Sequence, residues 1–285
     1  NHEAIGIGTI VGSSLFNALI IVGYSLIIGP IRIVSWVPIY RDLIFYLLSV
    51  VLLYYFFMNG SVSLTEALIL IAVYGLYILI MFYWKKWFRY KDSEIPGSTA
   101  NIKPGKPPSN RMAALLEGFH GSVSPFLDRH FFLSFLISIG VITLISWVLV
   151  KLAIYISAEL GVPEMIIGLT VIAIGTSIPD LISSGIVARR GRTGMAINNS
   201  IGSNVFDILI GLGLPILLYA AITGKEGPVE NRALVWSFLL LLSSIALLFL
   251  ARVTYKAGSI KLTGFFLVFL YLVYLFIEIS GVRVV

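Results

Sequence analysis

Two aspartates, Asp180 and Asp207, lie well inside long apolar segments of the sequence. A carboxylate at the depth of a lipid bilayer is energetically costly unless it faces a cavity, a partner or an ion. Glu66 and Glu278 lie near the ends of such segments, where headgroups and water solvate them, and we assign them structural roles. Asp180 and Asp207 are therefore the first candidates for function.

Each aspartate belongs to a line of oxygen-bearing side chains at helical spacing, and a third line begins near residue 9. The three lines are Thr9, Ser13 and Asn17; Thr176, Ser177, Asp180 and Ser184; and Ser200, Ser203, Asn204 and Asp207. Residues three or four positions apart share one face of a helix. Hydroxyl, amide and carboxylate oxygens, without His or Cys, suit hard cations such as Na⁺, K⁺, Ca²⁺ and Mg²⁺. Because a lone hydroxyl in a membrane helix often bonds to its own backbone, the aspartates carry most of this hypothesis.

A proline, Pro179, directly precedes Asp180. Its ring removes a backbone donor and disrupts the hydrogen bond to the carbonyl four residues back, at Gly175. We therefore expect the helix to unwind near Gly175 and Thr176. Loosened carbonyls at this depth are tolerated where they line a cavity, and there they can coordinate a cation.

The composition identifies the environment of these residues. Of the 285 residues, 58% are hydrophobic and 12% are charged, about half the charged share of an ordinary soluble domain. This excludes a soluble globular fold and predicts an all-α polytopic membrane protein, because helices satisfy their own backbone in lipid. The absence of cysteine excludes disulfides and thiol chemistry, and membrane topology explains the net charge of +6 better than nucleic-acid binding does.

Eight segments are long and apolar enough to cross a bilayer, which takes about 20 residues of helix. They lie near residues 5–29, 42–58, 64–84, 131–151, 163–188, 195–221, 233–251 and 260–279. Sixteen of the 20 Lys and Arg residues, Arg41 among them, fall in loops on one side; the other four are Lys151, Lys225, Arg232 and Arg283. The positive-inside rule places the sixteen in the cytoplasm.

The long cytoplasmic connection, residues 85–130, contains a candidate amphipathic helix. Its apolar positions at i, i+3, i+4 and i+7 are Met112, Leu115, Leu116 and Phe119. Such a segment can lie at a membrane interface or regulate the protein, but we favour a solvated linker.

The sequence contains an internal repeat. Residues Gly6–Gly23 align with Ala196–Gly213 at a constant offset of 190, and Asn17 aligns with Asp207. The two copies occupy the first and sixth spans, so they run in opposite directions. Inverted repeats are typical of transporters that expose a midplane site to each side in turn. The second half, 131–285, has five spans and the first, 1–84, has three, so we expect ten spans with two before Asn1.

The motif Gly-Leu-Thr-Val-Ile-Ala-Ile-Gly-Thr-Ser-Ile-Pro-Asp, which ends at Asp180, and the motif Ser-Ile-Gly-Ser-Asn-Val-Phe-Asp, which ends at Asp207, carry a family resemblance. Together they resemble the second alpha repeat of the cation/calcium antiporters, most of all the potassium-dependent sodium/calcium exchangers. The segment from Gly8 to Asn17 resembles the later part of the first alpha repeat.

This resemblance implies an inverted-repeat antiporter fold and Ca²⁺ transport coupled to opposing Na⁺, with K⁺ as a further ion, no cofactor and no catalytic residue. It implies that Asp180 is a carboxylate ligand of the central Ca²⁺ site, and that Asp207 is the aspartate associated with K⁺ dependence. The neighbouring oxygen ligands that it implies are Thr176, Ser177, Ser203, Ser13 and Asn17. The ion-binding Glu of the first repeat is not in the sequence, and we expect it before Asn1. The expected location is the plasma membrane.

Two other functions fit parts of the sequence. An intramembrane aspartyl protease also places two aspartates on neighbouring spans to activate water. The usual Gly-x-Gly-Asp motif of such proteases is absent, because Asp180 follows Ile-Pro and Asp207 follows Val-Phe. A related antiporter without K⁺ dependence is the second alternative. A helical receptor predicts neither the repeat nor the polar lines.

Overall fold

A computed structural model describes residues 3–29, 36–88, 131–229, 235–253 and 257–280. The chain divides into two compact units, one formed by residues 1–95 with 157–285 and the other by residues 96–156. Most of the long helix α6 (Phe131–Leu160), up to Ile156, forms the described part of the second unit. The predicted amphipathic helix at Met112–Phe119 lies outside the described residues.

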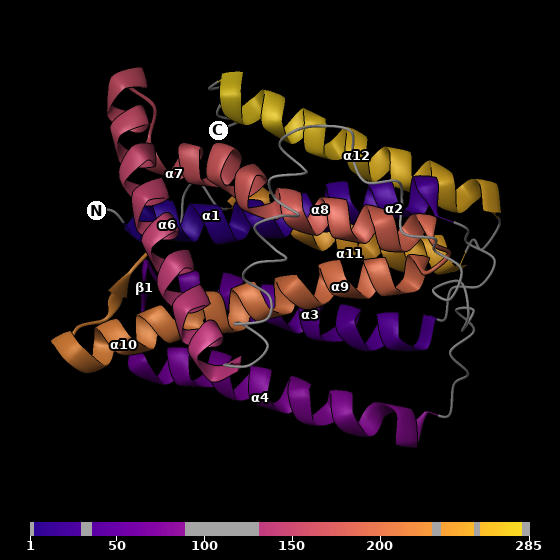
Figure 1. Ribbon diagram of the computed structural model, residues 1–285, viewed down its shortest axis with the longest axis horizontal. Coiled ribbons are helices and arrows are strands. Elements are labelled where there is room, and N and C mark those ends of the chain that lie inside the picture. Colours follow the sequence, from indigo (N-terminus) through magenta and orange to yellow (C-terminus); the bar gives the residue numbers. More distant parts are fainter. Residues whose placement is uncertain (1–2, 30–35, 89–130, 230–234, 254–256, 281–285) are drawn as a thin grey trace. The chain divides into compact units, whose positions relative to one another are not determined.

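The first unit is built from long helices, several of which contain a π-helical turn, labelled η (Figure 1). In chain order its helices are α1 (Glu3–Leu15), η1 (Phe16–Ile21), α2 (Val22–Ile28), α3 (Trp36–Phe57), α4 (Leu64–Trp87), α7 (Glu164–Ile167), η3 (Gly168–Ile172), α8 (Ala173–Arg189), α9 (Thr193–Phe206), η4 (Asp207–Leu212), α10 (Gly213–Thr223), α11 (Val235–Val253) and α12 (Ala257–Ser280). Two short strands, β1 (Ser61–Val62) and β2 (Gly227–Pro228), pair antiparallel and join two loops on the predicted outer side.

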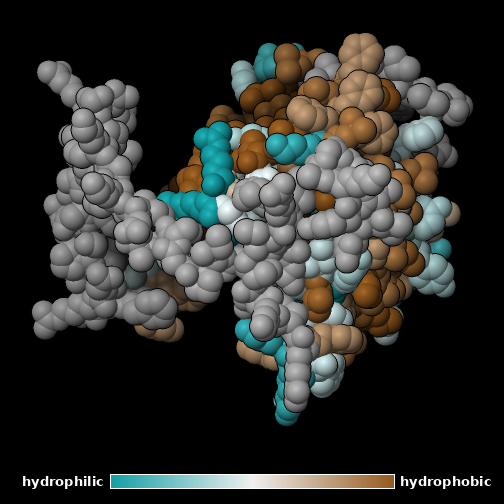
Figure 2. All heavy atoms as spheres, turned by 90° about the vertical axis from the view of Figure 1, so that its right-hand side faces the viewer, coloured by the Kyte–Doolittle hydropathy of each residue, from teal (hydrophilic) through white to brown (hydrophobic). Residues whose placement is uncertain are grey.

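The hydropathy of these helices fits a membrane environment. Among the described residues, seven helical stretches are long and apolar enough to cross a bilayer, and Val235–Leu250 is a shorter apolar helix. Each of the eight overlaps one predicted span, so the predicted all-α polytopic membrane fold is confirmed. Large apolar side chains such as Phe82 and Phe265 stay exposed, and Figure 2 shows brown, apolar side chains over much of the visible surface. Such exposure suits contact with lipid.

The second predicted span begins too late. Helix α3 starts at Trp36, not near residue 42, and Pro38 lies in its first turn, where a missing N–H costs nothing. Arg41, which the sequence places in a loop, is therefore inside the helix and only 9% exposed.

At the start of the next span, the Glu66 side chain accepts a hydrogen bond from the Ser63 N–H and completes a capping box at α4. The structural role assigned to Glu66 is confirmed.

The two copies of the repeat run antiparallel, as predicted. In Figure 1 the segment α1 to α2 runs from left to right, and α9 to α10 runs from right to left. The first span packs against the fifth at backbone distance: a Cβ on Gly8 would meet the Met165 carbonyl oxygen at 2.7 Å, and one on Gly168 would meet the Ile5 carbonyl oxygen at 2.6 Å. Small residues permit this approach in membrane helices.

The far ends of the two copies make equivalent contacts. Gly23 of α2 packs against Gly264 of α12, where an added Cβ on either residue would meet the carbonyl oxygen of the other within 2.8 Å. Gly213, which aligns with Gly23, packs against Ala67 and Leu70 of α4. Each copy therefore packs against the last helix of the opposite half of the sequence.

The predicted unwinding near Pro179 is wrong. Helix α8 is continuous from Ala173 to Arg189 with Pro179 inside it. Proline removes one hydrogen bond, and helices α1 and α9 pack along α8 and hold it in place. The departures from α geometry are the π-helical turns η1, η3 and η4. Of these, η1 and η4 coincide to within one residue under the repeat alignment, and such turns are frequent at functional sites.

Replacing Gly8 by Ala should destabilise the protein by about 1–3 kcal/mol, because the methyl group overpacks the contact between α1 and the fifth span. Gly6→Ala is the matched control, since a Cβ there has no neighbour within 4 Å. Thermal unfolding of both variants in detergent measures the difference. Equal melting temperatures for the two variants would contradict the packing described here.

Candidate functional site

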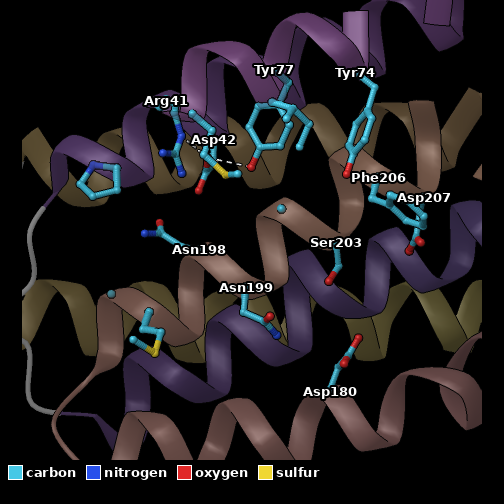
Figure 3. Close-up of a pocket in the computed structure, with 16 residues that line it drawn as sticks. Arg41, Asp42, Tyr74, Tyr77, Asp180, Asn198, Asn199, Ser203, Phe206 and Asp207 are labelled. Carbon is cyan, nitrogen blue, oxygen red and sulfur yellow. Dashed lines mark hydrogen bonds and ion pairs between the residues drawn. The ribbon is translucent and has the colours of Figure 1, made fainter. Parts of the chain in front are cut away.

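A cavity of about 660 Å³ lies between α3 and α4 on one wall and α8, α9 and η4 on the other (Figure 3). Its polar lining residues are Arg41, Asp42, Tyr74, Tyr77, Asp180, Asn198, Asn199, Ser203 and Asp207. All of them belong to the first unit. The cavity therefore contains both aspartates predicted from the sequence.

Asp180 and Asp207 come from neighbouring helices that a tight turn holds antiparallel. Gly191, with φ of 85°, lies between α8 and α9 in a left-handed conformation that suits glycine. In Figure 3 the Asp180 side chain points from α8 toward Ser203, and the carboxylate of Asp207 lies one turn beyond Ser203. Two carboxylates and a hydroxyl thus face the same space.

Ser13 and Ser177 connect the first repeat to this region. Their hydroxyl oxygens are 2.9 Å apart, and either can be the donor. Ser13 also lies near the Asp207 carboxylate. Thr176 is arranged differently: it does not line the cavity, and its hydroxyl donates to the carbonyl oxygens of Ile172 and Ala173 at 2.9 and 3.2 Å.

Asn17 lies in a buried contact between the two repeat copies instead of in the cavity. Its Nδ2 donates to Asn204 Oδ1 at 3.1 Å, and Asn204 Nδ2 donates to the Ser14 carbonyl at 2.9 Å. The Ser200 hydroxyl donates to the Asn17 carbonyl at 2.7 Å. Within the described residues, Asn17 Oδ1 is buried and has no hydrogen-bond partner. Asn17 therefore serves mainly as a contact between the two copies.

The predicted polar line on the sixth span has two functions. Ser203 and Asp207 line the cavity, whereas Ser200 and Asn204 bind the first repeat. The four side chains share one broad face of the helix. One edge of this face packs against the first repeat, and the other edge lines the cavity.

The donor set is rich in oxygen and contains few charges. Among the described residues, no three His, Cys, Asp or Glu side chains form a group that could hold a metal ion. Asp180 and Asp207 would supply two negative charges, and hydroxyl and amide oxygens would complete the coordination. Such ligands suit hard cations that bind reversibly.

The family model described as "Sodium/calcium exchanger protein" matches residues 1–83 and 130–280. The chain belongs to this exchanger family. The match covers both copies of the repeat and every helix that lines the cavity. The predicted membership of the cation/calcium antiporter superfamily is confirmed.

Several relatives of this exchanger-family chain carry a more specific name. Sodium/potassium/calcium exchanger 4 of Mus musculus is 40% identical over 153 residues, which are 53% of this chain and 25% of the relative. Sodium/potassium/calcium exchanger 1 of Homo sapiens is 40% identical over 154 residues, or 14% of its length. The chain thus spans a quarter or less of these relatives. CaxA of Alkalimonas amylolytica, named as an antiporter, is 29% identical over 91% of this chain and 75% of its own length.

Solved structures with the same fold are also transport proteins by name. The sodium-calcium exchanger NCX_Mj, in crystals soaked with Na⁺ and Sr²⁺, aligns with a TM-score of 0.54 and 25% identity over 95% of this chain and 75% of that chain. An H⁺/Ca²⁺ exchanger called CAX shares the fold with a TM-score of 0.53 at 16% identity. The predicted inverted-repeat antiporter fold agrees with both.

Sequence reasoning missed a third carboxylate in the cavity of this exchanger-family protein. Asp42 is 1% exposed and pairs with Arg41, whose Nε lies 2.7 Å from Asp42 Oδ1. The sequence predicts a second span that begins near residue 42 with Arg41 in the preceding loop, and it singles out no carboxylate there. The apolar residues before Arg41 and Asp42, with Pro38 at a typical helix start, are the signal that could have placed Asp42 inside the helix.

Asn204→Ala should destabilise the protein by about 2 kcal/mol, because it removes the hydrogen-bond acceptor of the buried Asn17 amide and the hydrogen bond to the Ser14 carbonyl. Asn199→Ala is the matched control on the same helix, where the side chain is exposed, and it should change stability by less than about 0.5 kcal/mol. Thermal unfolding in detergent reports both values. A control variant as unstable as Asn204→Ala would refute the role of this contact.

Proposed function

We propose that this exchanger-family protein is a secondary active antiporter that moves Ca²⁺ against Na⁺ by alternating access, with no chemical step. The observation that carries the proposal is that Asp180, Ser203 and Asp207, all from predicted spans, line one cavity. The antiparallel repeat copies support it, since two pseudo-symmetric halves can exchange inward-open and outward-open shapes around such a site. The exchanger names of the relatives and structural neighbours agree.

The proposed Ca²⁺ ligands are Asp180 and Ser203, which face the cavity, together with Ser177 and Ser13. The short distance between the Ser13 and Ser177 hydroxyls puts two oxygen donors from opposite halves side by side. Asn17 would contribute its unpartnered Oδ1. Thr176 is a weaker candidate, because its hydroxyl hydrogen is committed to helix carbonyls, although its oxygen still has lone pairs.

We also propose that transport requires K⁺ and that Asp207 is the residue responsible. The names of several relatives, those of Mus musculus and Homo sapiens among them, contain potassium. At the aligned position of the first repeat the side chain is the neutral Asn17, so Asp207 adds one negative charge that the symmetric position lacks. An antiporter without K⁺ dependence is the alternative.

The intramembrane protease is disfavoured by the geometry of the aspartates. A catalytic dyad shares one proton between two carboxylates in direct contact. In the part of the chain that the structure describes, no hydrogen bond joins the two carboxylates, which come from different helices, α8 and η4 (Figure 3). A proteolytic activity that requires either aspartate would restore that alternative.

The proposed setting is the plasma membrane, with the loop at 85–130 in the cytoplasm. The apolar helices and the family membership support an integral membrane protein. The lipid bilayer and the three cations are the proposed partners, and the ions are cargo instead of cofactors.

Asp180→Asn should reduce Na⁺-dependent Ca²⁺ flux by on the order of a hundredfold or more, because a divalent ion loses a charged ligand in a site of low dielectric. The measurement is ⁴⁵Ca²⁺ uptake into Na⁺-loaded proteoliposomes. Glu66→Gln is the matched control: it removes a carboxylate outside the cavity, and Gln can still accept the capping-box hydrogen bond. Normal flux in Asp180→Asn would rule out the assigned site.

Asp207→Asn should remove the K⁺ requirement while Ca²⁺ flux persists, because it replaces the proposed K⁺-binding carboxylate with the residue type of the first repeat. Ca²⁺ flux is compared with and without K⁺ on the Ca²⁺ side, again with Glu66→Gln as the control. If the variant remained strictly K⁺-dependent, the role of Asp207 would be wrong. If the unaltered protein needed no K⁺, the antiporter without K⁺ dependence would replace this part of the proposal.

A further inference from the structure

A buried ion pair forms the wall of the cavity opposite Asp180. Arg41 Nε donates to Asp42 Oδ1 at 2.7 Å, and the Tyr77 hydroxyl donates to the same oxygen at 3.1 Å. The Arg41 guanidinium lies 5.9 Å from the centre of the Tyr77 ring. Figure 3 shows Arg41 and Asp42 at one end of the cavity and Asp207 at the other.

The end that holds this pair is the predicted cytoplasmic end. Arg41 and Asp42 lie in the second turn of α3, shortly after the helix begins at Trp36. Trp84, next to the two lysines in the last turn of α4, donates from its Nε1 to the Val37 carbonyl at 3.2 Å. The positive-inside rule assigns those lysines to the cytoplasm. The cavity therefore has two acids at depth and a neutral ion pair near the cytoplasm.

Stability alone is a poor explanation for the pair. When two charges are buried, the free energy that they lose by desolvation roughly offsets the free energy of their mutual attraction. A protein with a hydrophobic pair of similar volume in their place is often as stable. Arg41 stays charged in any environment found in proteins. A guanidinium beside a cation cavity repels cations unless a carboxylate cancels it, and Asp42 is in direct contact with it.

We propose that the Arg41–Asp42 pair is a selectivity element in which Asp42 cancels the charge of Arg41 at the cytoplasmic end of the cavity and thereby sets the preference of the cavity for Ca²⁺ over Na⁺. This inference rests on the proposed antiporter function. With the pair intact, Asp180 and Asp207 are the acids among the described lining residues whose charge no paired arginine cancels. A carboxylate without its arginine would retain Ca²⁺, and an arginine without its carboxylate would repel Ca²⁺ twice as strongly as Na⁺.

The test is Asp42→Asn, which removes the negative charge of the pair and makes this end more positive by one unit. Because electrostatic energy is proportional to the charge of the ion, the fold-loss of Ca²⁺ affinity should be about the square of the loss for Na⁺: a threefold loss for Na⁺ goes with about a ninefold loss for Ca²⁺. ⁴⁵Ca²⁺ binding to the purified protein in nanodiscs, with Na⁺ as competitor, gives both affinities. Equal losses for the two ions would overturn the proposal.

The double variant Arg41→Gln with Asp42→Asn separates charge from direct ligation. It restores the original net charge of the cytoplasmic end, so it should recover most of the Ca²⁺ affinity that Asp42→Asn loses. If the double variant binds Ca²⁺ as weakly as the single one, Asp42 is a ligand and the proposal is overturned. Arg189→Gln is the matched control, since Arg189 donates to Tyr24 outside this cavity, and it should leave the ratio of the two affinities unchanged.

A variant that adds a negative charge tests the same proposal if Asp42→Asn does not fold. Asn198 lines the same end of the cavity, and its Oδ1 has no partner within the described part of the chain. Asn198→Asp should strengthen Ca²⁺ binding by about the square of its effect on Na⁺, and an unchanged ratio of affinities would overturn the proposal. If the proposed antiporter function is itself wrong, the result is different: the unaltered protein and Asp180→Asn would then bind Ca²⁺ equally weakly.

Discussion

Inside a bilayer no water is present to bind an unsatisfied polar group, so each such group must find its partner within the protein. This constraint explains how the first unit is built. The backbones of the first and fifth spans approach at glycines, and amide side chains satisfy one another between the two repeat copies. Once these contacts are made, Asp180, Ser203 and Asp207 are left facing a cavity. The site consists of the polar groups that make no contact between helices and therefore line the cavity.

The features that depend on this constraint were predictable from the sequence. Eight apolar spans, the antiparallel repeat and the candidate aspartates all came from the spacing of apolar and polar residues. The division of the sixth span was not predictable, because Ser200 and Ser203 are only about 60° apart around a helix with 3.6 residues per turn. Which of two such neighbouring positions meets another helix, and which meets a cavity, is decided by tertiary packing.

Two local rules failed for the same reason. Charged residues usually end a span, and proline usually breaks a helix, yet α3 contains Arg41 and Asp42, and α8 continues through Pro179. In each case a contact elsewhere in the protein offsets the local cost. Tyr77 of α4 donates a hydrogen bond to Asp42, and the helices packed along α8 outweigh one lost backbone hydrogen bond. A sequence shows the cost directly but shows the compensating contact only through the fold.

The repeat also shows how a charge can be introduced without altering the backbone. Asn17 and Asp207 occupy aligned positions at the π-helical turns η1 and η4. The amide donates a hydrogen bond to Asn204, which a carboxylate cannot do, and Asp207 lines the cavity. Exchanging the two residues would therefore break a contact in one copy and remove a charge in the other. The two aligned positions therefore differ in role: Asn17 in the first copy holds the two copies together, and Asp207 in the second places a carboxylate in the cavity.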